Sequence, residues 1–301
     1  MSFRISTWNC FGMGQGLSAI RARRAPFADR FLHDRVLTEC AAPDILCLQE
    51  LLSRDAQRFF DGVGTERFTS RFRDHNRPRF AGRLTMRGSG LGIGARTPLG
   101  NTTVRTLAGV PSGWDRLARK GALHTRLAVP GGITIDLMTV HLQAGYDARA
   151  IGSRTAQLAD LRRFIDEVGS RDRPFIVCGD FNIDGLEHAR SGTQYRSLAA
   201  AFEGFEDLGA AADLPTFDPH PERNALAHAL EPDADSQRID YIFWRPARDR
   251  SRLRCQRVDL FFDQSLARPA RTSAASVWAS DHYGLSATFV LEGHTATTNG
   301  P

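Results

Sequence analysis

Short apolar runs recur along the chain and predict a protein built largely from β-strands. The first run, Phe3–Trp8, alternates apolar and polar positions, as a strand with one buried face does. Gly131 and Gly132 stand between two such runs and predict a hairpin turn, because glycine readily adopts the backbone conformations of tight turns. The predicted strands cover residues 3–8, 44–49, 91–95, 122–129, 133–140, 175–178, 238–244, 258–262 and 283–291.

Helical patterns are fewer. One helix, with Ser153 as its expected N-cap, places these apolar side chains on a single face: Leu158, Leu161, Phe164, Ile165 and Val168. A second helix is expected to end near Pro43, and a short amphipathic segment near 198–205. Residues 52–89 show no clear pattern, and 184–237 are expected to be rich in loops.

The order of these elements predicts the fold class. A helix between two strands favours layered α/β packing, and neither an internal repeat nor a linker divides the chain. We therefore predict one domain over residues 1–292, followed by a disordered tail over 293–301.

Composition narrows the class of protein only slightly. A chain of 301 residues with 42% hydrophobic content can bury a large core. The net charge of +5 mildly favours polyanionic partners such as nucleic acid or anionic lipid. However, Lys120 is the only lysine among 39 basic residues, and no basic run interleaved with aromatic residues indicates a dedicated nucleic-acid surface.

The cysteines and the N-terminus favour a reducing compartment. The five cysteines are odd in number, lie mostly inside apolar runs and show no CxxC spacing, so we expect reduced core residues. The segment MSFRISTWN has neither the basic nor the apolar part of a signal peptide, and no run approaches the length of a membrane span. We expect a cytoplasmic protein, although a signal peptide trimmed before this sequence begins would leave secretion open.

Polar residues that bind hard cations or move protons stand at the ends of the predicted strands. They are Asn9, Glu50, His141, Asp180, Asn182, Asp281 and His282. Any one of them alone is more often an ordinary turn or loop residue, but their recurrence at strand ends predicts a common site. Carboxylate and amide oxygens without a Cys/His cluster favour Mg²⁺ or Mn²⁺ over Zn²⁺.

Two further features concern this expected site. In the segment FIVCGDFN (175–182), we expect Gly179 to turn the chain sharply so that Asp180 and Asn182 stand at the mouth of the strand. Asp240 lies inside an apolar strand, where an unpaired charge is costly, so it requires a buried partner.

These segments resemble the endonuclease/exonuclease/phosphatase superfamily, which has the DNase I-like fold. The matching motifs occur in the family's order, and they are TWN (7–9), LQE (48–50), VHLQA (140–144), GDFN (179–182), RIDYIF (238–243) and SDH (280–282). The resemblance implies a four-layer α/β/β/α sandwich of two mixed β-sheets with helices outside. It also implies a metal-dependent phosphodiesterase or phosphatase cleft along one edge of the sheets.

The resemblance assigns a metal site and a base. Glu50 would be the main Mg²⁺ ligand, with Asn9 and Asp281 as helpers, and Mn²⁺ would be a possible substitute. His282 would be the general base for the attacking water, and Asp240 would hold its imidazole in position.

The resemblance also assigns the groups that face the phosphate. Asp180 would align the water or assist the leaving group. Asn182 and His141 would hydrogen-bond the phosphoryl oxygens, or His141 would instead protonate the leaving oxygen. Lys120 is a candidate substrate-side cation, with a solvated loop lysine as the alternative.

Within the superfamily, three stretches resemble the neutral sphingomyelinase and phospholipase C-like branch. They are HLQAG (141–145) with RTAQLADLRRFI (154–165), WDRLARKG (114–121) and TFDPHPERNALA (216–227). We therefore expect a Mg²⁺-dependent phosphodiesterase that uses direct water attack, with a choline phospholipid as the first substrate. The alternatives are a DNase I-like nuclease acting on nucleic acid and, from another class, a non-catalytic scaffold of the same fold. No obligate protein partner is evident in the sequence.

The chain departs from that branch at two places. The segment Gly88–Ser89–Gly90 stands where the family often has an acid directed toward the first histidine, so His141 lacks that partner. Residues 263–279 offer only Trp278 in place of the aromatic hairpin that secreted sphingomyelinases insert into membranes.

Overall fold

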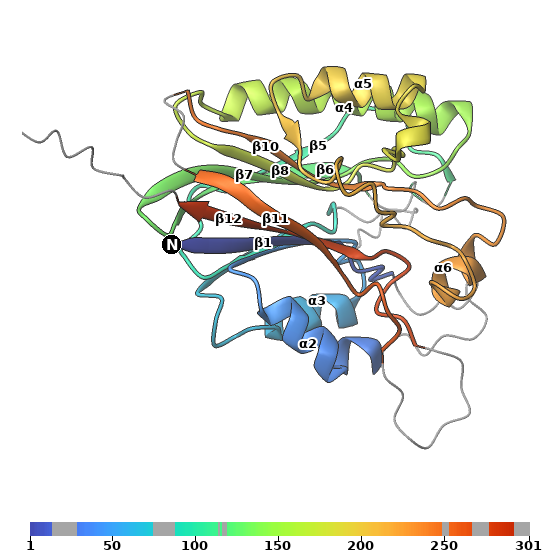
Figure 1. Ribbon diagram of the computed structural model, residues 1–301, viewed down its shortest axis with the longest axis horizontal. Helices are drawn as coiled ribbons and strands as arrows, with labels where there is room; N and C mark the ends of the chain where they lie inside the picture. Colours follow the sequence, from blue (N-terminus) through green and yellow to red (C-terminus); the bar gives the residue numbers. More distant parts are fainter. Residues whose placement is uncertain are drawn as a thin grey trace, which may run out of the picture.

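Two β-sheets pack face to face, and helices cover their outer surfaces (Figure 1). The computed structural model describes residues 1–13, 29–74, 88–113, 115, 119–248, 253–266 and 277–291. The expected four-layer sandwich of two mixed sheets is confirmed. The expected tail, 293–301, lies outside the described residues. In the described ranges, no helix combines the length and the apolar character needed to cross a membrane.

The first sheet contains the first and the last of the described strands in chain order. In spatial order its strands are β11 (Leu253–Phe261), β12 (Gly284–Leu291), β1 (Ser2–Asn9), β2 (Ile45–Gln49), β4 (Gly92–Ala95) and β3 (Ser70–Arg73). Only the pair β1 and β2 is parallel within this sheet of described strands. The outer face is covered by η1 (Asp29–Leu32), α2 (Asp34–Ala41) and α3 (Arg54–Gly62), as Figure 1 shows for the two α-helices.

The second sheet comes from the middle of the chain. Its strands in spatial order are β5 (Thr103–Thr106), β6 (Gly121–Val129), β7 (Ile133–His141), β8 (Phe175–Asp180), β10 (Asp240–Arg245) and β9 (Glu206–Asp207). Helices α4 (Ala148–Val168) and α5 (Thr193–Ala201) lie over its outer face (Figure 1). Two short helices, η3 (Glu187–Ala189) and α6 (Ala225–Leu230), belong to the long connection between β8 and β10.

The hydrophobic core has one layer between the sheets and one under each group of helices. Ile5, Cys47, Leu137, Cys178 and Phe289 belong to the central layer. Because strands alternate their side chains, the other face of each strand packs against helices, as Val177 of β8 does against the apolar face of α4. Both faces of the central strands are therefore buried, which explains their nearly continuous apolar runs.

Most of the expected strands are confirmed within a few residues, and so is the hairpin, where Gly131 and Gly132 both have positive φ between β6 and β7. The expected N-cap of α4 is wrong. The helix begins at Ala148, and the side chain of Asp147 accepts a hydrogen bond from the Ala150 backbone N–H. Ser153 lies inside the helix and donates its hydroxyl hydrogen bond to the Val110 carbonyl.

The segments without a clear pattern contain regular elements. Between residues 52 and 89 the chain forms α3, capped by Ser53, and β3. Helix α3 buries Ala56, Phe59 and Phe60, but its nine residues are too few for a conspicuous periodic signal. Strand β5 was likewise not expected, because its four residues are all partly or fully exposed.

Gly179 does not turn the chain. It lies within β8 with φ of 137°, and the chain turns only after Asp180, where Asn182 has φ of 51°. A Cβ atom on residue 179 would lie 2.0 Å from the Val140 carbonyl oxygen of the neighbouring strand. Glycine is therefore required here by the close approach of β7 and β8, as well as by its backbone conformation.

Replacing Gly179 by alanine is expected to destabilise the protein by about 3 kcal/mol or more, because backbone of β7 must move and the new residue is strained. The matched control is Gly152→Ala in α4, where nothing lies within 4 Å of the new Cβ atom. That change should stabilise the helix by about 0.5–1 kcal/mol. Urea unfolding of both variants measures the two effects, and a similar small change in both would contradict the steric argument.

A buried charge network ties β6 and β7 to the start of β8. Asp136 is fully buried, and its carboxylate lies 3.0 Å from His124 Nε2, from Arg126 Nε and from Arg173 Nε. Burial alone would raise the pKa of Asp136, but the hydrogen bonds of His124 and Arg126 and the charge of Arg173 outweigh it and hold this pKa below its usual value.

The network predicts a pH-dependent stability. Asp136→Asn should cost about 3 kcal/mol at pH 7, because it removes the buried carboxylate that accepts the hydrogen bonds of Arg126 and Arg173. The stabilising contribution of Asp136 is present above its ordinary pKa of 3.8 and is lost as the pH falls through its lower folded-state pKa. The stabilities of parent and variant, measured by urea unfolding from pH 7 to pH 3, should therefore converge in acid. A constant difference over that range would be inconsistent with this linkage, and exposed Asp172→Asn serves as the control.

Candidate active site

The strand registers place the expected site residues along one edge of each sheet. In the second sheet, His141 of β7 is paired with Asp180 of β8, and Asp180 is paired with Asp240 of β10, so three ionisable side chains stand in one row. In the first sheet, Asn9 at the end of β1 is paired with Gln49 at the end of β2, and Glu50 follows directly. Because the sheets pack face to face, both edges contribute to one site.

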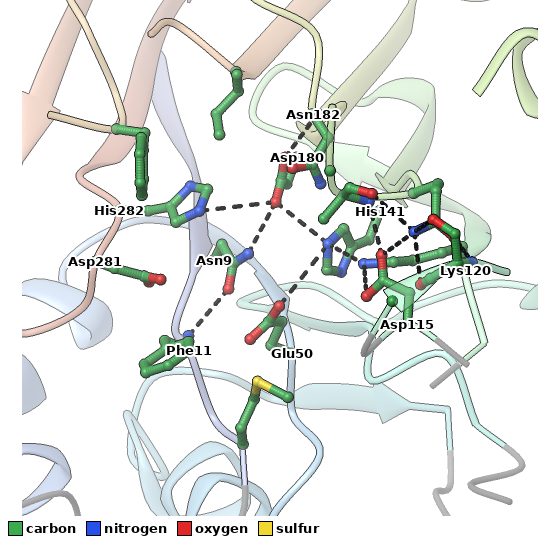
Figure 2. A pocket seen from close by; sticks show the side chains of 18 of the residues that line it. Asn9, Phe11, Glu50, Asp115, Lys120, His141, Asp180, Asn182, Asp281 and His282 are labelled. Atoms are coloured by element: carbon green, nitrogen blue, oxygen red, sulfur yellow. Dashed lines mark hydrogen bonds and ion pairs between the residues drawn. The ribbon is translucent and has the colours of Figure 1, made fainter. Parts of the chain in front are cut away.

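Asp180 is the centre of this group. Its Oδ2 accepts a hydrogen bond from Asn9 Nδ2 at 2.9 Å and lies 3.3 Å from His141 Nε2, while its Oδ1 accepts from the Asn182 backbone N–H at 2.9 Å (Figure 2). Burial, together with the charge of Asp240, raises the pKa of Asp180 to about 6, although His282 opposes the shift. The two sheets are thus joined at the site by the contact between Asn9 and Asp180.

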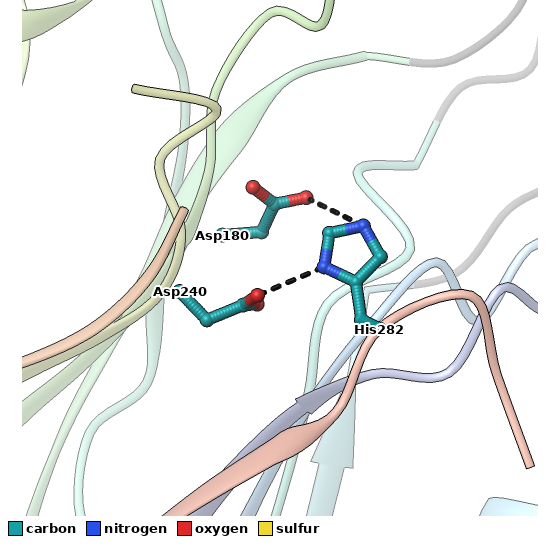
Figure 3. A group of neighbouring side chains, drawn as sticks. All are labelled: Asp180, Asp240 and His282. Carbon is teal, nitrogen blue, oxygen red and sulfur yellow. Dashed lines mark hydrogen bonds and ion pairs between the residues drawn. The ribbon is translucent and has the colours of Figure 1, made fainter. Parts of the chain in front are cut away.

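His282 lies between two carboxylates. Its Nδ1 is 2.8 Å from Asp240 Oδ2, and its Nε2 is 4.0 Å from Asp180 Oδ2 (Figure 3). The expected partner of Asp240 is therefore His282. Although burial alone would lower the pKa of His282, the charge and hydrogen bond of Asp240 raise it well above its usual value. Asp240 is held in turn by Thr216, whose hydroxyl oxygen accepts from the Asp240 backbone N–H at 3.0 Å.

Glu50 offers an uncompensated carboxylate to the site. Its Oε2 is buried and has no hydrogen-bond partner among the described residues, and its backbone has φ of 61°, a strained value for a non-glycine residue. Burial, opposed by Lys120 and reinforced by Asp281, raises the pKa of Glu50 to about 7. Asp281 and Asn9 line the same pocket. The other oxygen, Oε1, lies 4.0 Å from His141 Nε2. A buried carboxylate with one unpaired oxygen, beside further oxygen donors, fits a hard divalent cation.

A second set of donors is also close enough to hold a metal ion. One ligand atom each of Asp180, Asp240 and His282 lies within 4.8 Å of the others (Figure 3). However, His282 Nδ1 and Asp240 Oδ2 are already bonded to each other, so only the other nitrogen and the other oxygen could bind an ion without breaking this contact. Glu50 Oε2 and Asp240 Oδ1 are both buried without a hydrogen-bond partner among the described residues. The oxygen donors of Asn9 and Asp281 in the same pocket make the Glu50 side the better cation site.

His141 is flanked by a cation that the sequence analysis placed near the substrate. Lys120 Nζ lies 2.7 Å from His141 Nε2 and 3.0 Å from Asp115 Oδ1. Burial, together with the charges of Lys120 and His282, holds the pKa of His141 well below its usual value, so the imidazole is neutral at pH 7. A neutral Nε2 facing an ammonium group accepts its hydrogen bond. Asn182 also faces this region, and its Nδ2 donates to the Leu142 carbonyl.

Two residues of the site were not predicted from the sequence. Asp115 fixes Lys120 and also accepts hydrogen bonds from Gln143 Nε2 and the Ala144 N–H, and its only signal was its place in WDRLARKG. Buried Arg30 donates to the carbonyl oxygens of Cys10, Phe11 and Ala279. Arg30 thereby fixes the segments that follow Asn9 and precede Asp281, and no sequence motif marks it.

The structure shows what surrounds His141 and Trp278, the residues at the two places where the sequence departs from the sphingomyelinase branch. His141 is without an acid from 88–90, but Asp180 lies beside it instead, and Ser89 donates to Asp74. Trp278 is 7% exposed and packs with Phe11, Leu226 and Tyr283, so it does not present its ring to a membrane.

All of the expected site residues except Asp240 line one pocket of about 200 Å³, and Asp240 lies directly behind His282. Figure 2 shows Asn9, Glu50, Asp180 and the two histidines directed toward a common centre. The arrangement offers a histidine backed by a carboxylate, a neutral histidine beside a lysine, and an oxygen-rich cation site. These are the groups that hydrolysis of a phosphate ester requires.

A family comparison agrees with this chemistry. The model of the Endonuclease/Exonuclease/phosphatase family matches residues 6–282. The chain belongs to this family. Its members are hydrolases that act on phosphodiesters, and the match covers every motif from which the resemblance was inferred.

The similar proteins in the comparisons include a sphingomyelinase, a beta toxin and a DNA-bound protein. A sphingomyelinase of Dictyostelium discoideum is 27% identical over 208 residues, which are 58% of this chain and 44% of that protein, so the chain spans less than half of the relative's length. A beta toxin variant from Staphylococcus aureus with bound magnesium ions has a TM-score of 0.67 at 15% identity, covering 95% of this chain and 99% of the other. D. rerio TDP2 in complex with a single-stranded DNA product has a TM-score of 0.66 at 20% identity, covering 96% and 99%. At these identities the two structures show that the DNase I-like fold is shared.

Proposed function

We propose that the protein is a Mg²⁺-dependent phosphodiesterase that releases phosphocholine from a choline phospholipid by direct attack of water. One observation carries this proposal. His282, which is bonded to Asp240, converges in one pocket with Asp180 and with Glu50, whose Oε2 has no hydrogen-bond partner among the described residues. The sphingomyelinase relative supports the choice of substrate.

In this proposal the neutral imidazole of His282 removes the proton from the attacking water, so the raised pKa of His282 restricts the active form to the pH range above that pKa. Asp240 bonds Nδ1, which fixes the ring orientation and leaves Nε2 directed toward the pocket and Asp180. The carboxylate also stabilises the imidazolium that forms when Nε2 takes the proton. Asp180, 4.0 Å from Nε2, is placed to accept a hydrogen bond from the same water and to align it.

On the other side of Asp180, His141 and Asn182 act on the phosphate. Lys120 supplies positive charge next to His141. The Lys120 ammonium and the Asn182 amide can donate hydrogen bonds to phosphoryl oxygens, where negative charge increases in the transition state. Since His141 is neutral and its Nε2 accepts from Lys120, it serves better to position the Lys120 ammonium group beside the phosphate than as the acid for the leaving group.

The cation would be held by Glu50, with Asn9 and Asp281 beside it. When bound there, Mg²⁺ polarises a phosphoryl oxygen and neutralises charge on the reacting group. The magnesium ions bound in the beta toxin structure support this choice of ion, and Mn²⁺ would fit the same oxygen donors.

A nuclease of the same fold is the second candidate. The structural similarity to TDP2 with a DNA product and the net charge of +5 favour it. A nuclease would bind DNA with steep salt dependence, since each phosphate contact releases counterions. The cytoplasmic location expected from the sequence remains a prediction under both candidates.

A hydrolysis panel on the purified protein tests the proposal. The substrates are sphingomyelin in mixed micelles, plasmid DNA and single-stranded DNA, each with Mg²⁺ and with EDTA. Phosphocholine release that EDTA abolishes is the expected result. Nicking of DNA without phosphocholine release would instead establish the nuclease, and no hydrolysis of any substrate would leave the scaffold alternative.

A further inference from the structure

The mouth of the pocket carries more negative than positive charge. Among the described residues that line it, the acids are Glu50, Asp115, Asp147, Asp180, Glu231 and Asp281, whereas the Lys and Arg residues are Arg119 and Lys120. Lys120 is already paired with Asp115. A cation at Glu50 and Asp281 would compensate those two acids, so three lining acids, Asp147, Asp180 and Glu231, remain against Arg119.

An exposed aromatic ring stands beside this charge. Tyr146 lines the pocket and is 59% exposed, whereas Phe11 and Phe217 of the same pocket are buried. The Tyr146 hydroxyl donates to Glu231 Oε2 at 3.3 Å and accepts from Gln237 Nε2 at 3.0 Å. Both bonds hold the tip of the ring, so the ring itself stays in a defined position while it remains open to a ligand.

The backbone around these side chains is fixed by the fold. Tyr146 directly precedes Asp147, the N-cap of α4, and Glu231 follows the last residue of α6. Gln237 pairs with Phe217, which in turn pairs with His282. The ring and the carboxylate are therefore connected through short backbone contacts to the base of the proposed reaction.

We propose that Tyr146 and Glu231 form a subsite for the quaternary ammonium group of the substrate, with the phosphate at His141 and Asn182. This inference rests on the proposed phosphodiesterase function and specifies its substrate class. An aromatic ring and a carboxylate together attract an alkylated ammonium, which cannot donate hydrogen bonds and is bound by charge and by the π-face. A polynucleotide, which brings negative charge to the same mouth, would instead be repelled by Glu231 and Asp147.

The test compares soluble substrates that differ in a single charge. The first is p-nitrophenyl phosphorylcholine, and the second is its dimethylbutyl isostere, in which carbon replaces the ammonium nitrogen. The ratio of kcat/KM for these two esters measures recognition of the cation alone. Since both values come from one preparation, the ratio does not depend on how much of a variant is correctly folded.

The parent protein is expected to prefer the choline ester by about 10-fold. Glu231→Gln keeps an oxygen to accept the tyrosine hydrogen bond but removes the charge, and it should lower the ratio by about 5-fold. Tyr146→Ala should bring the ratio close to one, whereas Tyr146→Phe retains the ring and most of the preference. Glu203→Gln, which removes the same charge from an exposed site outside the pocket, should leave the ratio unchanged.

The possible results distinguish failure of the proposed subsite from failure of the proposed phosphodiesterase function. If the parent hydrolyses both esters equally, or if Tyr146→Ala and Glu231→Gln retain the parent's ratio, the subsite is wrong and the phosphodiesterase function stands. Faster hydrolysis of the p-nitrophenyl ester of thymidine monophosphate than of the choline ester would overturn the subsite in favour of a nuclease. If the parent hydrolyses none of the three, the proposed function and the subsite fail together.

Discussion

Replacement of His282 by alanine is expected to lower kcat/KM for a phosphodiester substrate by about 10²- to 10⁴-fold. The side chain is 7% exposed, its Nδ1 is bonded to Asp240, and its Nε2 faces Asp180 across 4.0 Å. No other described histidine in the pocket can replace it, because His141 is engaged by Lys120 and Asp180 on the opposite side. The measurement is the steady-state rate with saturating Mg²⁺.

Two variants make this result specific. His188→Ala removes a histidine that is 68% exposed and outside the pocket, and it should keep the parent's rate. Asp240→Asn keeps the shape of the pair but removes the charge that stabilises the imidazolium, so it should also reduce the rate strongly. A His282→Ala protein that retains its fold and more than a tenth of the parent's activity would rule out His282 as the general base.

The fold was predictable from the sequence wherever strands are buried on both faces. Strand β8 and the hairpin of β6 and β7 are long apolar or β-branched runs with clear turn residues, so their boundaries were nearly correct. Short elements escaped prediction, because α3 and β5 present too few buried side chains to create a periodic signal. The start of α4 was misplaced because Asp147 and Ser153 are both good capping residues, and only tertiary contacts distinguish them.

The site was predictable to the extent that it is built from strand ends. Asn9, Glu50, His141 and Asp180 end or follow strands, and parallel neighbours such as β7 and β8 bring such residues to one edge. The sequence did not reveal Asp115 or Arg30, because both act through contacts with segments far away along the chain. It also suggested the wrong role for Gly179, since a close approach to Val140 depends on strand pairing rather than on local turn chemistry.

The grouping of charges at these strand ends also carries a cost in stability. Asp180 and Asp240 pair within the sheet, and the buried Glu50 oxygen has no hydrogen-bond partner among the described residues. Burial of charged groups that lack enough hydrogen-bond or ion-pair partners opposes folding. Proteins retain such buried charges where the same groups serve binding or catalysis. The cation proposed for this pocket would provide the missing compensation.

Replacement of Glu50 by glutamine is therefore expected to abolish the response to Mg²⁺. The rate with Mg²⁺ should fall by about 10³-fold, since a metal ion contributes several kcal/mol to stabilising charge in the transition state. Without Mg²⁺, the variant should unfold at the same temperature as the parent or a higher one, because a buried carboxylate whose Oε2 has no hydrogen-bond partner among the described residues has been removed.

Thermal unfolding in a Mg²⁺ titration separates cation binding from catalysis. The parent should gain about 2.7 kcal/mol of stability when Mg²⁺ reaches a hundred times its Kd, and Glu50→Gln should lose most of this gain. Glu66→Gln, which removes an exposed carboxylate, serves as the matched control. If Asp240→Asn removes the Mg²⁺-dependent gain while Glu50→Gln retains it, the cation is held by Asp180, Asp240 and His282 instead. In that case His282 is a ligand rather than a base, and the roles proposed for the two halves of the pocket must be exchanged.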